Sequence, residues 1–315
     1  DVEIRRSLVA AVWGTGIIVG ERQGTSSSLR LRDSELRNCH YAGICIRKGN
    51  DSTTVERCRV SGAAWHGIRY DDCSPAIVGN RIFGNARCGI YASGKTAATV
   101  RQNLFYANEM VGMSCWFQNR DTIEGNTFAG NKQAGLSILG ASEPVVQKNI
   151  FFSESDAVVC GDIGSDSAFA VSDGVVAVRN NLFWNNIRKL VRRLAKTADS
   201  ESTTKEIAID KQAGNVEADP MFVNAEGEDF SLKAGSPARR SGIGIVRPVG
   251  FGSPWPIQPE EAAIIPDGRT RDYRKWKKPP QNAPPATSSD TFGRGRSAPF
   301  DLSDIALLYH NDSKV

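Results

Sequence analysis

The feature that most constrains the fold of this 315-residue chain is a segment of about 23 residues that recurs eight times. In each copy an aliphatic residue lies three positions before a Ser, Cys or Asn anchor, and an apolar residue lies two positions after it. Successive anchors are 27, 24, 22, 23, 23, 23 and 32 residues apart. They are Ser7, Ser34, Cys58, Asn80, Asn103, Asn126, Asn149 and Asn181. A self-similar period of this size indicates a solenoid, in which each repeat forms one coil.

The residues within each repeat indicate strands rather than helices. Three short runs of β-branched or aromatic residues, such as 98–100, 104–106 and 112–116, are bounded by Gly, Asn or Asp. The repeats do not show the apolar spacing of three and four residues that marks a helix. We therefore predict an all-β fold, a right-handed parallel β-helix of about eight coils followed by closing strands. With ~4.8 Å between neighbouring coils, such a rod would be about 40 Å long.

Two columns of asparagine are predicted to hold the turns. One column consists of the asparagine anchors, and the other lies five residues after four of the anchors, at Asn85, Asn108, Asn131 and Asn186. A stacked asparagine bonds both the backbone and the asparagine of the next coil, which produces a ladder. We assign these ladders a structural role and no chemistry.

The repeats predict a β-helix domain over residues 1–246, with insertions at about 161–174 and 187–214. Within the second insertion, residues 187–194 have the pattern of a short basic amphipathic helix. Residues 247–315 form a Pro-rich basic extension. We expect it either to pack along the rod or to be disordered.

Charge and composition exclude some classes of protein. The net charge is +4, and Lys and Arg are mostly spread along the chain, so nucleic-acid binding is not favoured. There is no run of 18 apolar residues, and we expect no membrane span. Because Ile4 already occupies a core column, we expect a cap or further coils to precede it, since an open solenoid end needs covering.

The seven cysteines do not have the spacing of zinc ligands. Cys115 and Cys160 fall in an inward column, and Cys58 is at an anchor. We predict buried free thiols, since free cysteine behaves as a small hydrophobe. Disulfides between neighbouring coils are the alternative.

The repeat Gly-Asn-x-Phe-x-x-Asn-x-x-x-Gly-(apolar)-x-(apolar), as in residues 125–138, resembles that of the right-handed β-helix repeat family of bacterial pectate-lyase-like proteins. Residues 218–223 and 229–238 resemble the closing strands of such proteins. The resemblance covers roughly residues 1–246 and implies the fold, together with a secreted, periplasmic or cell-surface bacterial location. It does not imply one activity, because the superfamily contains lyases, hydrolases, epimerases and binding proteins.

In the proteins that the chain resembles, the glycine-led strands form one sheet whose outward side chains line a groove for a sugar chain. Six coils have such a glycine, at Gly16, Gly43, Gly67, Gly89, Gly112 and Gly135. Because side chains alternate across a strand, the residues two and four positions after each glycine point outward. The substrate-binding residues predicted on this basis are Arg47, Asp71, Tyr91 and Trp116. Aromatic rings stack on sugar rings and cations pair with uronic carboxylates.

Catalytic roles on the same face are predicted for Lys95, Arg69 and His66. A lyase or epimerase must abstract the proton next to a uronic carboxylate, which requires a base and a neutralising cation. Lyases of this fold often use calcium, and Asp71 with Asp72 is the acidic pair available to hold it, although two carboxylates are few for such a site. A hydrolase would need two or three converging carboxylates and ranks lower.

Three functions therefore remain open. The first is a polysaccharide lyase or uronate epimerase, and the second is a non-catalytic protein that binds an acidic polysaccharide on the same face. The third is a structural or interaction solenoid, in which Arg69 and Asp71 form a plain surface ion pair and the rings are covered by other parts of the chain. Placement of Tyr91 and Trp116 on different sheets would exclude the groove.

Overall fold

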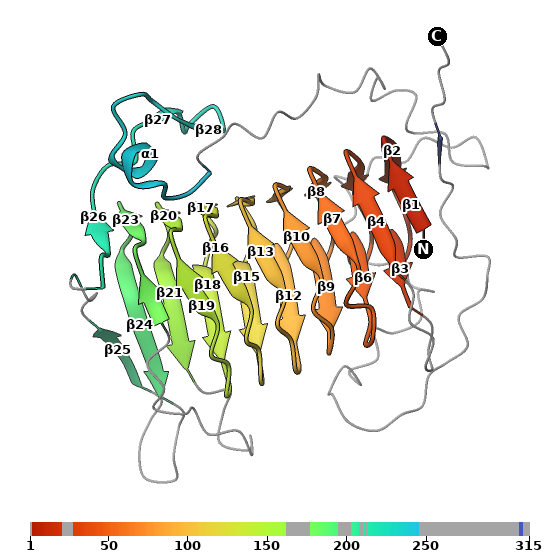
Figure 1. Cartoon of the computed structure of the whole chain (residues 1–315), viewed down its shortest axis with the longest axis horizontal. Coiled ribbons are helices and arrows are strands. Elements are labelled where there is room, and N and C mark those ends of the chain that lie inside the picture. Colours follow the sequence, from red (N-terminus) through yellow and green to blue (C-terminus); the bar gives the residue numbers. More distant parts are fainter. Residues whose placement is uncertain are drawn as a thin grey trace, which may run out of the picture.

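The computed structural model describes residues 2–20, 28–161, 177–194, 203–207, 211, 213–245 and 309–310. In these residues the chain winds into a right-handed parallel β-helix with three sheets that follow the length of the rod (Figure 1). We call them sheets A, B and C. The fold class predicted from the repeat is confirmed.

Each coil contributes one strand to each sheet. Sheet A contains β1 (Val2–Arg5), β4 (Leu29–Arg32), β7 (Thr54–Glu56), β10 (Ala76–Val78), β13 (Thr99–Arg101), β16 (Thr122–Glu124), β19 (Val145–Gln147) and β22 (Ala177–Arg179). Sheet B contains β2 (Ser7–Ala10), β5 (Glu35–Arg37), β8 (Arg59–Ser61), β11 (Arg81–Phe83), β14 (Leu104–Tyr106), β17 (Thr127–Ala129), β20 (Ile150–Phe152), β23 (Leu182–Trp184) and β26 (Val216–Glu217), with β29 (Tyr309–His310) antiparallel beside β2. Sheet C contains β3 (Ile17–Val19), β6 (Ile44–Ile46), β9 (Ile68–Asp71), β12 (Ile90–Ser93), β15 (Val111–Trp116), β18 (Ala134–Leu139), β21 (Asp156–Gly161), β24 (Arg188–Leu194) and the antiparallel β25 (Thr203–Ile207).

The core lies inside the coils, where apolar residues of neighbouring strands stack in register. Four phenylalanines illustrate this, with ring centroids 4.7, 5.0 and 5.3 Å apart along the column. They are Phe105, Phe128, Phe151 and Phe183, and all four are fully buried. Burial of apolar side chains, at roughly 25 cal/mol per Å², is the main source of stability for such a rod.

Both asparagine ladders form as predicted. Asn103 donates from Nδ2 to Oδ1 of Asn126 at 3.0 Å and to the carbonyl oxygen of Ile77 at 2.8 Å. The first ladder continues one step beyond the predicted anchors, because Asn181 donates to Oδ1 of Asn215 at 3.3 Å. In the second ladder a glutamate, Glu154, occupies the place of one asparagine.

Sheets A and B meet at a corner made by a single residue whose φ is positive. The corner residues and their φ angles are Arg6 (49°), Asp33 (49°), Arg57 (50°), Gly79 (68°), Gln102 (53°), Gly125 (64°), Lys148 (55°) and Asn180 (54°). A residue other than glycine is strained in this region, at a cost of about 1–2 kcal/mol. The anchor residue follows each corner residue directly, so the ladder holds the chain beside a residue of positive φ.

The helix expected at residues 187–194 is wrong. These residues include β24, which pairs in parallel with β21 and antiparallel with β25. The open edge of β21 offers unpaired backbone groups, and their hydrogen bonds outweigh the weak local preference for a helix. The rod therefore continues through β24, where we expected an insertion to interrupt it.

The closing segments form an antiparallel hairpin of β27 (Phe222–Asn224) and β28 (Asp229–Leu232), followed by the short helix α1 (Pro237–Ser241). Figure 1 shows them beside the strands of sheet B in the later coils. Phe230 contacts Tyr106 and Phe222, with ring centroids 5.6 and 5.3 Å apart, and the Tyr106 hydroxyl donates to Glu228 at 3.1 Å. Aromatic packing thus attaches this hairpin to the outward face of sheet B.

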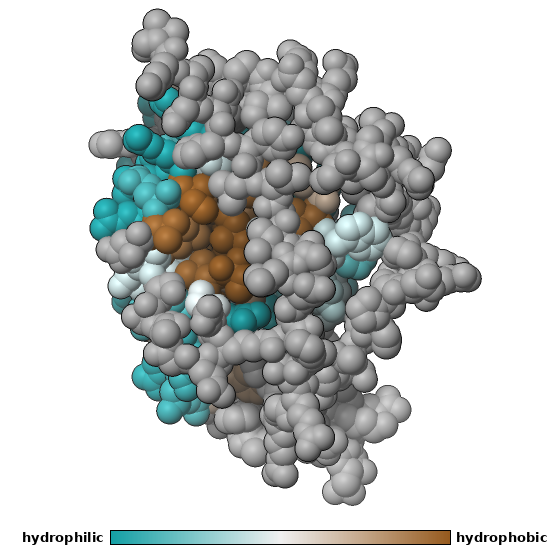
Figure 2. Space-filling model, turned by 90° about the vertical axis from the view of Figure 1, so that its right-hand side faces the viewer, coloured by the Kyte–Doolittle hydropathy of each residue, from teal (hydrophilic) through white to brown (hydrophobic). Residues whose placement is uncertain are grey.

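The view onto the end of the rod shows hydrophobic residues gathered among hydrophilic ones at the first coil (Figure 2). Val2 and Ile18 of this coil are 58% and 45% exposed. In the described parts of the chain, no helix has the length and apolar character needed to cross a membrane.

Candidate functional site

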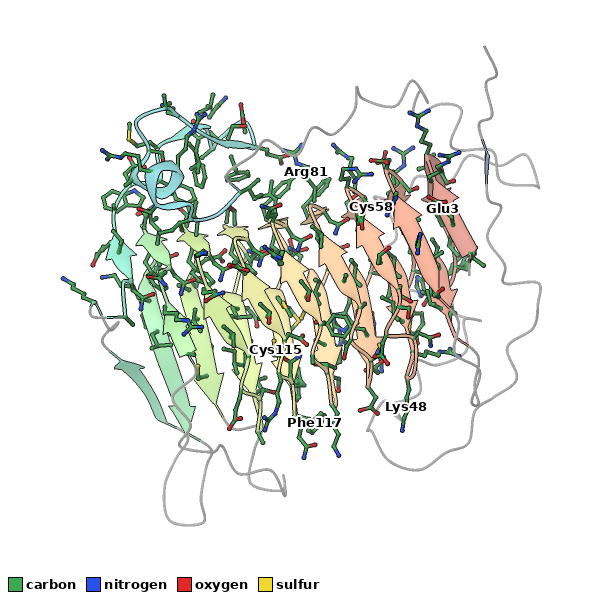
Figure 3. The ribbon with its side chains drawn as sticks, viewed as in Figure 1. Glu3, Lys48, Cys58, Arg81, Cys115 and Phe117 are labelled. Atoms are coloured by element: carbon green, nitrogen blue, oxygen red, sulfur yellow. The ribbon has the colours of Figure 1, made fainter. Side chains whose placement is uncertain are left out.

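The outward face of sheet C carries the residues that alternation predicts. Register places the residues two positions after each glycine in one column, namely Arg69, Tyr91, Ser114 and Ser137. It places the residues four positions after each glycine in a second column, namely Asp71, Ser93, Trp116 and Leu139. Between these columns lie inward residues such as Cys115, which Figure 3 labels within the rod. Tyr91 and Trp116 therefore belong to adjacent strands of one sheet, as the groove requires.

A groove of about 390 Å³ crosses this face. Its floor is apolar and nearly inaccessible to solvent, and it consists of Cys88, Val111, Ala134 and Val159. Its remaining lining residues are Trp65, His66, Arg69, Arg87, Tyr91, Met110, Ser114, Trp116, Gln133, Ser137 and Leu139. An apolar floor rimmed by aromatic and cationic groups is typical of a binding site for a ligand with both apolar and charged parts.

Aromatic rings form one side of the groove. The imidazole of His66 is stacked on Tyr91, with ring centroids 4.8 Å apart and an interplanar angle of 26°. The rings of Tyr91 and Trp116 have centroids 6.0 Å apart, and the indole nitrogen of Trp116 donates to Oγ of Ser114 at 2.7 Å. These contacts hold the rings in place before any ligand binds.

Two guanidinium groups lie against these rings. Nε of Arg69 donates to Oδ2 of Asp71 at 2.8 Å, and its Cζ lies 5.8 Å from the centre of the Tyr91 ring. The two charged side chains are 21% and 19% exposed, so this ion pair is more enclosed than an ordinary surface pair. Cζ of Arg87 lies 4.2 Å from the centre of the Trp65 ring. Such contacts orient a cation over an aromatic face.

His66 is held neutral. Its imidazole is buried, and the backbone N–H of Cys88 donates to its Nδ1 at 3.4 Å. Burial, reinforced by the positive charges of Arg69 and Arg87, lowers the pKa of His66 to about 3. Burial also raises the pKa of Tyr91 to about 12. Near neutral pH neither group is a strong base, because one binds protons weakly and the other keeps its proton.

The other predicted residues lie away from the groove lining. Lys95 is exposed in the turn after β12, and its backbone N–H donates to Oδ1 of Asp72 at 3.0 Å. Asp72 is likewise an exposed turn residue with a φ of 48°, and Arg47 lies beyond β6. Phe117 and Lys48, labelled in Figure 3, mark this end of sheet C, where the strands run into turns.

The acidic residues do not converge on a metal site. Among the described residues, no group of three or more His, Cys, Asp or Glu side chains is placed to hold an ion. Asp71 is bonded to Arg69, and Asp72 caps the next turn. Since calcium takes six to eight oxygen ligands, these two residues do not fit a calcium site on their own, and calcium stays a prediction.

Sequence reasoning missed part of the lining because, apart from His66, it considered only positions after the glycine. The positions one and two residues before it supply Trp65, Arg87, Met110 and Gln133, together with three floor residues. Their sequence signal was the same fixed offset from Gly67, Gly89, Gly112 and Gly135. An outward column before the glycine was therefore open to prediction.

The seven cysteines are free, as predicted, and no disulfide joins neighbouring coils. Five of them are buried, namely Cys39, Cys58, Cys73, Cys88 and Cys115.

Coils, sheets and groove together define the class of protein, a right-handed parallel β-helix with a groove on one sheet. A family model described as the right handed beta helix region matches residues 42–198. With the three sheets described above, this match confirms the resemblance to the right-handed β-helix repeat family.

Comparison with solved structures finds the periplasmic alginate epimerase AlgG at 15% identity and a TM-score of 0.46, over 56% of this chain and 43% of that one. A double mutant of the same epimerase gives 15% identity and a TM-score of 0.42, over 56% and 48% of the two chains. This chain thus spans less than half the length of those proteins. No curated protein matches the sequence.

Proposed function

We propose that the outward face of sheet C binds a segment of an acidic polysaccharide. The observation that carries the proposal is the grouping, around one groove, of the rings of Trp65, Tyr91 and Trp116 with the guanidinium groups of Arg69 and Arg87. The faces of sugar rings pack on aromatic rings, and uronic carboxylates pair with guanidinium groups. We propose with it a periplasmic, secreted or cell-surface location in a bacterium, which fits a polysaccharide ligand.

Binding fits the groove better than catalysis does. No carboxylate is among the residues that line it, so the pair of acids that a glycoside hydrolase requires is not supplied by the described residues. His66 and Tyr91 are poor bases near neutral pH, as their pKa values of about 3 and about 12 indicate. The groove nevertheless presents cations at fixed positions, which is sufficient for recognition.

The test is a titration by calorimetry with oligouronates and with neutral oligosaccharides of equal length. Arg87→Ala is expected to weaken binding of the oligouronate about tenfold and to leave neutral sugars unaffected, since a charge-assisted contact contributes about 1.5–3 kcal/mol. Arg101→Ala is the matched control, because Arg101 is an exposed arginine (51%) on sheet A. Equal affinity for charged and neutral sugars would refute the proposal.

Proton abstraction is the second candidate, as the step common to a lyase and an epimerase. The centre of the Tyr91 ring lies 5.8 Å from Cζ of Arg69, so a phenol, which would act as a base only in its deprotonated form, stands beside one fixed cation. Incubation with oligouronates in heavy water would report epimerisation, which returns a deuteron to the carbon next to the carboxylate, and ultraviolet absorbance would report the unsaturated product of elimination. We expect any activity to be lost in Arg69→Ala, whereas Lys95→Ala tests the predicted base.

A further inference from the structure

Eight aromatic rings from the first five coils form an unbroken series that begins in the turns between sheets B and C and continues onto sheet C. Successive ring centroids are 5.2, 6.1, 5.1, 5.8, 4.8, 6.0 and 6.0 Å apart. The series consists of Trp13, His40, Tyr41, Trp65, His66, Tyr91, Trp116 and Phe117. We call it the aromatic track, and the groove contains four of its rings, from Trp65 to Trp116.

The aromatic track runs obliquely rather than along the rod. Trp13 lies three residues before the glycine of its coil, Trp65 two before, Tyr91 two after and Trp116 four after. From the first coil to the fifth it advances about 19 Å along the axis, which is four coil spacings, while it moves from three residues before the glycine to four after it.

Repetition of the sequence does not account for this path. A repeat in register stacks like residues straight along the axis, as the internal phenylalanine column from Phe105 to Phe183 does. An oblique series requires aromatic positions that shift from coil to coil. Trp13 and His40 both lie three residues before the glycine and Tyr41 and Trp65 both lie two before it, and the later rings move past it. The path of the aromatic track therefore depends on outward residues that differ from coil to coil, and not on the residues that the repeat conserves in register.

The part of the aromatic track outside the groove is accessible. Trp13 is 39% exposed, and His40 and Tyr41 are half-buried. The cations that accompany the rings lie within the groove, with Arg87 on Trp65 and Arg69 on Tyr91. The surface before the groove thus continues the aromatic rings of the groove.

We propose that the bound polysaccharide crosses sheet C obliquely along the aromatic track, with the groove holding one part of it and Trp13, His40 and Tyr41 holding several further sugar rings. The inference rests on the proposed function and extends the same site. It predicts that Trp13 matters for long oligosaccharides and not for short ones, because only a long chain reaches it from the groove.

The experiment is a series of titrations with oligouronates from the dimer upward, comparing the parent with Trp13→Ala, Tyr41→Ala and Trp184→Ala. Trp184 is the matched control, since it is also 39% exposed but belongs to sheet B. For the parent, affinity is expected to rise with length. For Trp13→Ala we expect a loss of about tenfold for the longest oligomer and less than about twofold for the dimer. Circular dichroism checks that each variant is folded, and Tyr41→Ala serves if Trp13→Ala does not fold.

The outcomes separate the two proposals. If the parent binds oligouronates and neither variant changes the dependence on length, the oblique path is wrong and the groove alone binds the sugar. An equal loss in Trp184→Ala would also overturn the path. If the parent binds no oligouronate of any length, the proposed function fails, and the path fails with it.

Discussion

The backbone N–H of Cys88 points at Nδ1 of His66, one coil away, and donates a hydrogen bond to it at 3.4 Å. Nδ1 must therefore be unprotonated, and the remaining proton of the neutral ring belongs to Nε2. A second proton would add a charge to a buried ring that already faces Arg69 and Arg87. This contact shows why His66 supports the groove as a ring rather than as an acid or a base.

His66 is expected to make the protein less stable in acid. Its pKa is about 3 in the folded chain against an ordinary value near 6.5, so the unfolded chain binds more protons between these two values. The stability from the neutral ring is present above pH ~6.5 and is lost as the pH falls, at up to ~1.4 kcal/mol per pH unit. Urea unfolding of the parent and His66→Phe should show a shallower pH dependence in the variant. Identical slopes would contradict the assignment.

Glu154 is expected to act in the opposite sense. Burial raises its pKa well above the ordinary value, so its contribution to stability is complete in acid and is lost as the pH rises through the folded-state pKa. Asn131 donates to both of its carboxyl oxygens, at 2.8 and 2.9 Å. Glu154→Asn should remove this pH dependence and restore an uninterrupted ladder.

The control for that variant is Glu154→Ala, which leaves the backbone N–H of Asn131 without an acceptor and its Nδ2 with only the carbonyl oxygen of Phe105. We expect it to lower the free energy of unfolding by about 2–4 kcal/mol, since two buried donors lose a carboxyl acceptor. Chemical unfolding at acidic and neutral pH measures both variants. A Glu154→Asn protein as unstable as Glu154→Ala would show that the ladder does not accept asparagine there.

The buried thiols are expected to resist alkylation. Burial raises the pKa of Cys39, Cys58, Cys73 and Cys88 to about 12, so these thiols carry almost no thiolate near neutral pH. Titration with a chromogenic disulfide should find them unreactive in the folded protein, whereas all seven cysteines react in denaturant. The Cys58→Ser variant leaves three of these four buried thiols. If those three react fast in the folded variant, the coils open readily.

Salt should weaken sugar binding through Arg87. Arg87 is exposed, so its attraction for a carboxylate is screened at a Debye length of ~8 Å near physiological ionic strength. We expect the affinity for an oligouronate to fall with added salt, and to fall less steeply in Arg87→Ala. Calorimetric titrations at three salt concentrations measure this, and parallel slopes would exclude Arg87 from the contact.

The fold was predictable because the same sequence pattern recurs in every coil. The anchor column, the aliphatic residue three positions before it and the glycine-led strand each fix the same register, and eight copies leave little ambiguity. The strand at 188–194 was missed because it forms by pairing with β21, which lies 32 residues earlier. No local sequence pattern marks it as a strand. Glu154 was missed because its residue type differs from the asparagines of the column, although it lies the same five residues after an anchor.

The candidate site was predictable only in part. Alternation alone places Arg69, Tyr91 and Trp116 on one face, and the structure brings them together. Lys95 and Asp72 follow the end of a strand, where alternation no longer tells which way a side chain points. The neutral state of His66 depends on burial and on two arginines from different coils, which no spacing in the sequence expresses.

The asparagine ladders carry a consequence for how damage spreads. Each amide bonds only the coil on either side of it, so the rod is a line of nearest-neighbour couplings. Disruption of one coil near the middle, for example by a substitution at Asn103, would divide the protein into two blocks that unfold independently. One block would retain Trp13 and Tyr41, and Trp116 would lie in the disrupted coil between the two blocks.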